Sequence, residues 1–202
     1  MQLADCNGRG HRGDQHVLDE AALNALVDLV REGDQRALES VVAEFRPRIF
    51  RFALSRLGDS HTAEDVTQEA CMALAANLPT FENRGVKLSS YVFAITSNKV
   101  IDAQRAAKRR PDAMSDDVLI ERASVKEGPE DVAVRADEVR RLAEPLATLP
   151  ERDRNILLLR VVAQLSAEEV ADTLGMTPGA VRVAQHRALK SLRNRLDEGV
   201  SA

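Results

Sequence analysis

Apolar residues recur at intervals of three and four along most of this chain of 202 residues, which is the period of an amphipathic helix. Strand signals are absent, and capping and turn residues divide the pattern into successive helices. The predicted helices cover about 18–33, 34–57, 60–78, 88–110, 131–149, 156–161 and 165–195, the last range being two helices joined by a turn. The pattern therefore predicts an all-α fold.

Two of these helices carry features that complicate the simple pattern. Pro47 interrupts the helix that Asp34 caps, so we expect a bend or a break there. In the helix over 60–78, the residues expected to pack inward are Val66, Ala70, Met72, Ala73 and Leu78. An acidic surface near its start consists of Glu64, Asp65, Gln68 and Glu69. The helix macrodipole alone explains carboxylates at a helix N-terminus, and a docking face for a basic partner explains them equally.

The helix over 88–110 changes character along its length. Its first half is apolar almost all round, which indicates that it is buried or lies against a partner. Its second half carries Asn98, Lys99, Gln104, Arg105, Lys108, Arg109 and Arg110, with Asp102 as the only acid. Amide and guanidinium groups contact base edges and cations contact phosphates, so this half is a candidate DNA-binding surface. A solvated helix end with cations favoured by the dipole gives the same pattern.

The stretch from 165 to 195 has the layout of a helix-turn-helix. Ser166 with Glu169 forms a capping box for the first helix, and Gly175 provides the turn. Thr177 caps the second helix, and Pro178 stands at its first position. From 177 to 195 there are five cations and no Asp or Glu, which favours a helix lying in the major groove of DNA. A helical hairpin with a solvated basic face remains the alternative.

Composition supports localised contacts with nucleic acid. Aromatic residues make up 3% of the chain, which favours helices, and the net charge of −4 requires any DNA contact to come from local basic patches. Between Pro111 and Glu138, nine acids outnumber three bases, which indicates a linker. We therefore expect a disordered N-terminal tail over 1–17, a helical domain over 18–110, an acidic flexible linker over 111–134 and a second helical domain over 135–198.

Catalytic and metal chemistry are not indicated. Cys6, His11 and His16 are too loosely spaced for a convincing metal site, and the sequence has no Gly-rich phosphate loop and no nucleophile paired with a base. Two cysteines are too few for a disulfide framework. No apolar run suggests a membrane span or a signal peptide. We expect a cytoplasmic protein without membrane insertion, cofactor, metal or enzymatic activity.

Four motifs, in this order, resemble the extracytoplasmic-function (ECF) type of the sigma-70 family. They are AEDVTQEA (63–70), LSSYVFAITSNKVIDAQR (88–105), ATLPERDRNILLLR (147–160) and LSAEEVADTLGMTPGAVRVAQHRALKSLR (165–193). The resemblance covers 23–195, and the acidic linker falls between the second and third motifs. Within the family, VRVAQHRAL resembles an actinobacterial sigma-D-like branch.

The resemblance implies an alternative sigma factor that binds core RNA polymerase and directs initiation through the −10 and −35 elements of a promoter. Its first domain corresponds to sigma region 2 and its second to region 4. Asp65, Gln68 and Glu69 would bind the clamp helices of the largest catalytic subunit, while region 4 would meet the flap of the second-largest. The resemblance also implies an anti-sigma factor as a further partner.

Roles in DNA binding follow from the same resemblance. The loop over 81–87 would line a pocket for a flipped base, and the helix after it would help to melt the −10 element. The −10 residues would be Asn83, Arg84, Lys87, Tyr91, Asn98, Lys99, Arg105, Lys108 and Arg109. The −35 residues would be Thr177, Pro178, Gly179, Ala180, Arg182, Val183, Arg187 and Lys190.

The chain also departs from the family pattern. Tyr91 stands where relatives often have Trp, and Ala184 and Leu189 stand where many have Arg; Arg182-Val183 replaces Lys-Ser. Promoter sequence therefore cannot be carried over from relatives. Two rival functions are a stand-alone helix-turn-helix regulator, which would need an effector pocket or an α/β pattern in its first domain, and an anti-sigma decoy, which would lack intact basic faces.

Overall fold

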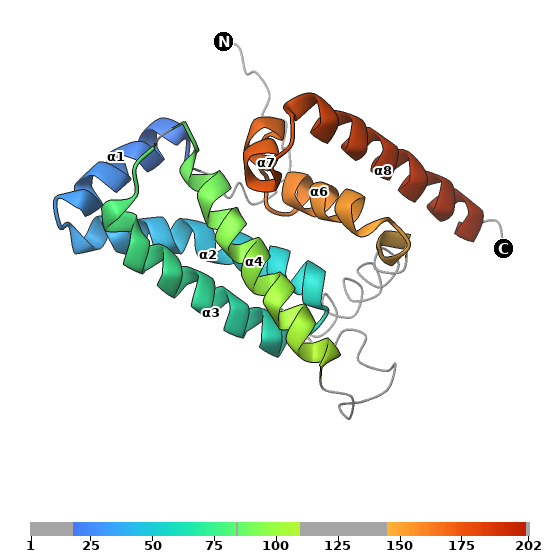
Figure 1. Cartoon of the computed structure of the whole chain (residues 1–202), viewed down its shortest axis with the longest axis horizontal. Coiled ribbons are helices and arrows are strands. Elements are labelled where there is room, and N and C mark those ends of the chain that lie inside the picture. Colours follow the sequence, from blue (N-terminus) through green and yellow to red (C-terminus); the bar gives the residue numbers. More distant parts are fainter. Residues whose placement is uncertain (1–17, 84, 110–144, 201–202) are drawn as a thin grey trace, which may run out of the picture.

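The computed structural model describes residues 18–83, 85–109 and 145–200, with side chains up to 195, and the regular structure in these ranges is helical (Figure 1). The first unit consists of α1 (Glu20–Arg31), α2 (Gln35–Leu57), α3 (Ser60–Asn77), the 3₁₀ turn η1 (Leu78–Thr80) and α4 (Leu88–Lys108). The second contains α6 (Glu151–Val161), α7 (Ala167–Leu174) and α8 (Pro178–Val200). The all-α prediction is confirmed. The predicted tail over 1–17, including Cys6, His11 and His16, and the predicted linker over 111–134 lie outside the described residues.

An aspartate caps the start of each of the first three helices, at Asp19, Asp34 and Asp59. The Asp34 carboxylate, for example, accepts hydrogen bonds from the backbone N–H groups of Arg36 and Ala37 at 2.8 and 3.2 Å. These donors have no partner within the helix, and the negative charge complements the helix dipole. The predicted cap at Asp34 is thus confirmed.

The expected interruption at Pro47 does not break α2, which continues through the proline to Leu57. Proline removes one backbone donor from the helix, but Phe45, Ile49 and Phe52 on either side of it are completely buried. Packing of this face against the neighbouring helices outweighs the local cost, as tertiary context often does. The helix ends instead at Gly58, whose φ of +74° lies in the left-handed region that favours glycine.

The core of the first unit lies along α2, which α3 and α4 cover. The rings of Phe52 and Phe93 meet edge to face with centroids 5.8 Å apart. On α3, Val66 and Ala70 are buried as expected, but Met72 is 63% exposed. The buried positions of α3 follow the helical period along one face and continue to Leu74, so Met72 falls on the opposite side. The inward placement of Met72 is therefore wrong.

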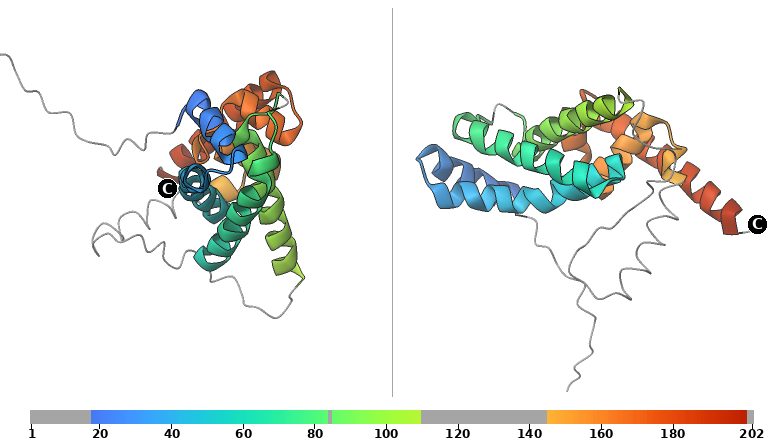
Figure 2. Two further views of the ribbon diagram at one scale, coloured as in Figure 1. Left: turned by 90° about the vertical axis from the view of Figure 1, so that its left-hand side faces the viewer. Right: turned by 90° about the horizontal axis from the view of Figure 1, so that it is seen from below.

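The second unit is a helix-turn-helix supported by α6. Ile156, Leu159 and Val181 are completely buried and join α6 to the two following helices. A smaller cluster of Leu149, Leu157 and Ala188 packs the start of α6 against the middle of α8. The C-terminal half of α8 extends away from the first unit, as two views show (Figures 1 and 2).

The two units are packed together, chiefly through α4 and α7. The Ser89 hydroxyl, at the start of α4, donates a hydrogen bond to the Glu169 carboxylate, and the Thr173 hydroxyl donates to the Ser90 carbonyl at 3.3 Å. The apolar first half of α4 thus lies against another part of the chain. This confirms the expectation, drawn from its apolar character, that this half is buried or contacts a partner.

A buried arginine crosses the same boundary from α2. Arg48 donates from Nε and Nη2 to the carbonyl oxygen of Ala163 at 3.1 and 2.7 Å, and its guanidinium stacks over the rings of Phe45 and Phe93. Burial lowers the pKa of this guanidinium, since desolvation disfavours the charged form. The carbonyl precedes Gln164, whose φ of +57° is unusual for a residue with a side chain. The interface thus includes a buried cation held by a turn of the second unit.

Candidate nucleic-acid and partner interfaces

The helix-turn-helix has the local chemistry that its sequence predicts. The Ser166 hydroxyl accepts the backbone N–H of Glu169 at 3.1 Å, and the Glu169 carboxylate accepts that of Ser166 at 2.6 Å. Gly175 ends α7 with a φ of +63°. Thr177 then accepts the backbone N–H of Ala180 at 3.2 Å, and Pro178 is the first residue of α8. The capping box, the turn and the second cap are confirmed.

The beginning of α8 presents its predicted DNA-binding residues to solvent. Thr177, Gly179, Ala180, Arg182, Val183, Arg187 and Lys190 are exposed, and Pro178 is half-buried. On the opposite side, Val181, Ala184 and Ala188 face the core. The structure therefore brings the −35 set together on one helix, with an apolar seam that fixes which face is outward.

Two of the cations on α8 are paired with carboxylates of neighbouring helices. Arg182 forms an ion pair with Glu168 of α7, and both side chains are largely exposed. Arg187 binds Asp153 of α6 through two hydrogen bonds of 2.9 and 2.8 Å. The Asp153 carboxylate raises the pKa of the Arg187 guanidinium, so this side chain is charged at every physiological pH.

The predicted −10 residues lie on α4 and on the loop before it. Asn83, Asn98, Arg105, Lys108 and Arg109 are exposed, while Arg84 lies outside the described residues. The half-buried Tyr91 packs against Phe81, with ring centroids 5.1 Å apart and planes tilted by 42°. An aromatic ring held in this way by its neighbour is suited to stack on an unpaired base.

Two −10 cations are also paired within the chain. The Lys87 ammonium lies 2.6 Å from a Glu20 carboxylate oxygen, and this contact raises the pKa of Lys87. Lys99 lies 2.8 Å from a carboxylate oxygen of Glu69. A phosphate would therefore compete with these carboxylates for the two ammonium groups, or share them.

The acidic surface of α3 is exposed, as a docking face must be. Asp65, Gln68 and Glu69 all face solvent, and Met72 is exposed beside them. An oxygen of the Asp65 carboxylate lies 3.3 Å from Nδ1 of His61, which is one turn earlier on the same helix. The side chains are therefore accessible, although Glu69 is also bound to Lys99 of α4.

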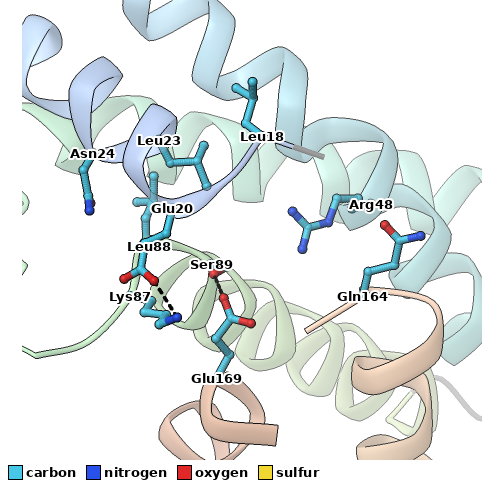
Figure 3. A pocket seen from close by; sticks show the side chains of 10 residues that line it. All are labelled: Leu18, Glu20, Leu23, Asn24, Arg48, Lys87, Leu88, Ser89, Gln164 and Glu169. Atoms are coloured by element: carbon cyan, nitrogen blue, oxygen red, sulfur yellow. Dashed lines mark hydrogen bonds and ion pairs between the residues drawn. The ribbon is translucent and has the colours of Figure 1, made fainter. Parts of the chain in front are cut away.

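A polar cavity of about 130 Å³ lies where α1, α2, α4 and the second unit meet (Figure 3). Its walls include Arg48 and Lys87, together with Glu20 and Glu169. Figure 3 shows Lys87 bound to Glu20 and Ser89 bound to Glu169 across it. The charges largely neutralise one another, so the cavity belongs to the contact between the units rather than to a charged ligand.

Sequence reasoning missed the carboxylates that hold the candidate DNA-binding cations: Glu20, Asp153 and Glu168. Asp153 and Arg187 are 34 residues apart, and Lys87 and Glu20 are on separate elements, so no local spacing could have paired them. Among the described residues there is no group of His, Cys, Asp and Glu able to hold a metal ion, and no helix is long and apolar enough to cross a membrane.

Comparison with known proteins places both units in families. Residues 41–110 match the family Sigma-70 region 2, and residues 140–192 match Sigma-70, region 4. A similar protein is ECF RNA polymerase sigma factor SigD of Mycobacterium tuberculosis, which is 43% identical over 178 residues; these cover 86% of this chain and 84% of SigD.

Solved structures show a similar fold. CnrH, solved in complex with the cytosolic domain of CnrY, has a TM-score of 0.65 at 24% identity, covering 86% of this chain and 96% of that one. The sigma factor RpoE of Bartonella quintana, solved with the anti-sigma factor NepR, has a TM-score of 0.61 at 21% identity, covering 79% and 96%. At these identities the likeness concerns the fold alone.

Proposed function

The chain belongs to the sigma-70 family and is an alternative sigma factor of the ECF type, and we propose that its two helical units divide promoter recognition between them. As a sigma factor it directs promoter-specific transcription initiation by RNA polymerase, and it is not an enzyme. The likeness to SigD supports a sigma-D-like branch. The proposed domains are 18–110 for region 2 and 135–198 for region 4, joined by a linker over 111–134.

The observation that carries this division is the exposed first half of α8. This half exposes cations and small residues that suit a major groove, while α7 and the turn at Gly175 support its buried side. Gly179 and Ala180 allow the backbone to approach the DNA closely, and Val183 can contact a thymine methyl group. Arg182, Arg187 and Lys190 supply the phosphate contacts. The proposed task of this helix is to bind the −35 element.

The proposed task of α4 and of the loop before it is to bind and melt the −10 element. Tyr91, supported by Phe81, offers a ring on which a flipped base can stack, and base stacking on an aromatic side chain is worth about 1–3 kcal/mol. Asn98 and Arg105 lie further along α4, where they face solvent. Lys87 and Lys99 would exchange their carboxylate partners for phosphates as the strand enters.

The proposed docking face for core polymerase is the exposed side of α3 that carries Asp65, Gln68 and Glu69. Carboxylates and an amide in one row suit a basic, hydrogen-bonding coiled coil, such as the clamp helices of the largest subunit. Region 4 would contact the flap of the second-largest subunit. The match of residues 41–110 to region 2 argues against a stand-alone regulator, and the exposed cations of α4 and α8 argue against a decoy.

We further propose that an anti-sigma factor restrains the protein and that it acts in the cytoplasm. RpoE of Bartonella quintana was solved with the anti-sigma factor NepR, and that protein shares this fold. A sigma factor works with RNA polymerase and chromosomal DNA, which places its activity in the cytoplasm. The partner itself can be identified by mass spectrometry of proteins that co-purify with the chain from its native cells.

The decisive experiment mixes the purified chain with core polymerase and measures affinity, open-complex formation and specific transcripts. Asp65→Ala with Gln68→Ala should weaken core binding at least about tenfold, as removal of interface hot spots does. The matched control, Glu39→Ala with Gln35→Ala, likewise removes one carboxylate and one amide, at exposed positions of α2. Unchanged core affinity in the first variant would refute the docking face. A chain that binds promoter DNA but never core would refute the wider proposal.

A further inference from the structure

Arg187 is held more tightly than the other exposed cations of α8. Its side chain is 65% exposed, yet Nε and Nη2 both donate to the Asp153 carboxylate, one to each oxygen. Asp153 itself is only 4% exposed and lies in the first turn of α6. The exposed guanidinium is therefore anchored by a buried carboxylate, in the two-pronged geometry that fixes both position and plane.

The anchoring helix is itself fixed relative to α8. At the other end of α6, Arg160 donates from Nε to Gln185 of α8 at 2.9 Å and also donates to the Leu165 carbonyl. Between these two contacts, Leu157 packs against Ala188. α6 thus provides a rigid support, and the direction in which Arg187 points is set by α6 as well as by α8.

The pairing leaves donors free for a ligand. A guanidinium has five N–H groups, and the contact with Asp153 uses two of them. The remaining three belong to the exposed part of the side chain. A phosphate oxygen could accept from them without breaking the pair, and the bound carboxylate would reduce the rotamer freedom that Arg187 loses on binding.

We propose that Asp153 is a positioning residue for −35 recognition: it fixes the Arg187 guanidinium so that its free N–H groups meet a DNA phosphate. This inference rests on the proposed function, in which α8 binds the −35 element. Arg182 provides a contrast, because its partner Glu168 is exposed and can release it. The arrangement assigns α6 a part in DNA binding through Asp153, which acts on Arg187 rather than on the DNA itself.

The test is the affinity of the full chain, assembled with core polymerase, for a fluorescent duplex carrying the −35 element over a range of salt concentrations. Asp153→Asn should weaken binding about 3- to 10-fold, the cost of immobilising one flexible side chain. Its salt slope should stay unchanged, because Arg187 still reaches the phosphate. Arg187→Ala should lower the slope by about 0.9. Arg187→Lys keeps the charge and a partner for Asp153, and should weaken binding with the slope intact.

The matched control is Asp172→Asn, which removes the same charge from an exposed position of α7. It should bind at least as tightly as the unaltered protein. Circular dichroism checks the fold of each variant, and Arg187→Lys decides the matter if Asp153→Asn does not fold. The proposal is overturned if Asp153→Asn and Arg187→Lys bind the duplex as tightly as the unaltered chain. It is also overturned if Arg187→Ala leaves the salt slope unchanged. If the unaltered chain fails to bind core polymerase, the proposed function is overturned instead. The role of Asp153 is then tested by measuring how the same variants bind the duplex without core polymerase.

Discussion

The contact between Ser89 and Glu169 should measurably stabilise the folded chain. Ser89 is almost completely buried, and its hydroxyl donates to a half-buried carboxylate of the other unit. A hydrogen bond to a charged group contributes about 1.5–3 kcal/mol, and partial access of water to Glu169 favours the lower end. We therefore expect a coupling free energy of about 1.5 kcal/mol between the two side chains.

A double-mutant cycle with Ser89→Ala and Glu169→Ala measures this coupling by urea unfolding. Loss of the capping box on Ser166 affects Glu169→Ala alone and the double variant equally, so it cancels in the cycle. The control cycle combines Glu169→Ala with Ser55→Ala in place of Ser89→Ala. The Ser55 hydroxyl donates to the Arg51 carbonyl at 2.7 Å within α2. The control should be additive. A coupling below about 0.5 kcal/mol in the first cycle would show that the two units do not form this contact in solution.

The same coupling should depend on pH. Burial raises the pKa of Glu169, but hydrogen bonds from Ser89 and Ser166 outweigh it, so the pKa lies below its ordinary value of 4.5. A lowered pKa means that the charged form is favoured in the folded state. Its contribution to the free energy of unfolding is present above pH 4.5 and is lost as the pH falls through the lowered pKa. A coupling that rises on acidification would refute this reasoning.

Three further variants test the fold and one thiol. Gly58→Ala should lower the free energy of unfolding by about 1 kcal/mol, because the φ of +74° strains a side chain although no atom lies within 4 Å of the added carbon; an unchanged urea midpoint would contradict this. Phe93→Ala should cost about 3–5 kcal/mol, since the ring is completely buried against Phe52, and a cost under about 1 kcal/mol would show a loosely packed site. In a Cys6→Ser background, Cys71 should react with iodoacetamide more slowly than free cysteine at about pH 8, because burial raises its pKa; equal rates would mean that the thiol is accessible and unperturbed.

Local sequence signals were sufficient for several helix caps and for the candidate surfaces, although the helix predicted over 156–161 begins earlier, at Glu151. Asp34, Ser166 and Thr177 could be identified as caps because each acts on N–H groups two or three residues away. The exposed face of α8 followed from the spacing of its apolar residues. Placement of the proposed DNA-binding and docking residues on α3, α4 and α8 required only that each helix have one buried side.

Interactions between distant residues could not be predicted in this way. Pro47 remains inside a helix because the α2 residues before and after it, such as Phe45 and Ile49, are buried against other helices. The pairing of Arg187 with Asp153 depends on how α6 crosses α8. In both cases the deciding contacts lie beyond the range of a helical period. Met72 is different, because the period of the buried residues of α3 already places it on the outer side of the helix.

The packing of α7 against α4 has a consequence for the span of the protein on DNA. The positions that name the −10 and −35 elements differ by about 25 base pairs, or roughly 85 Å of duplex at about 3.4 Å per pair. The helices α4 and α8 have 21 and 23 residues and are only about 32 and 35 Å long at about 1.5 Å per residue. In the proposed function, the two units therefore have to separate before both elements are bound. A fully extended stretch of 35 residues, the number from 110 to 144, spans at most about 120 Å at about 3.3–3.6 Å per residue, which exceeds this distance. On this proposal, separating the units costs the free energy of the contact between α4 and α7, and this cost opposes promoter binding.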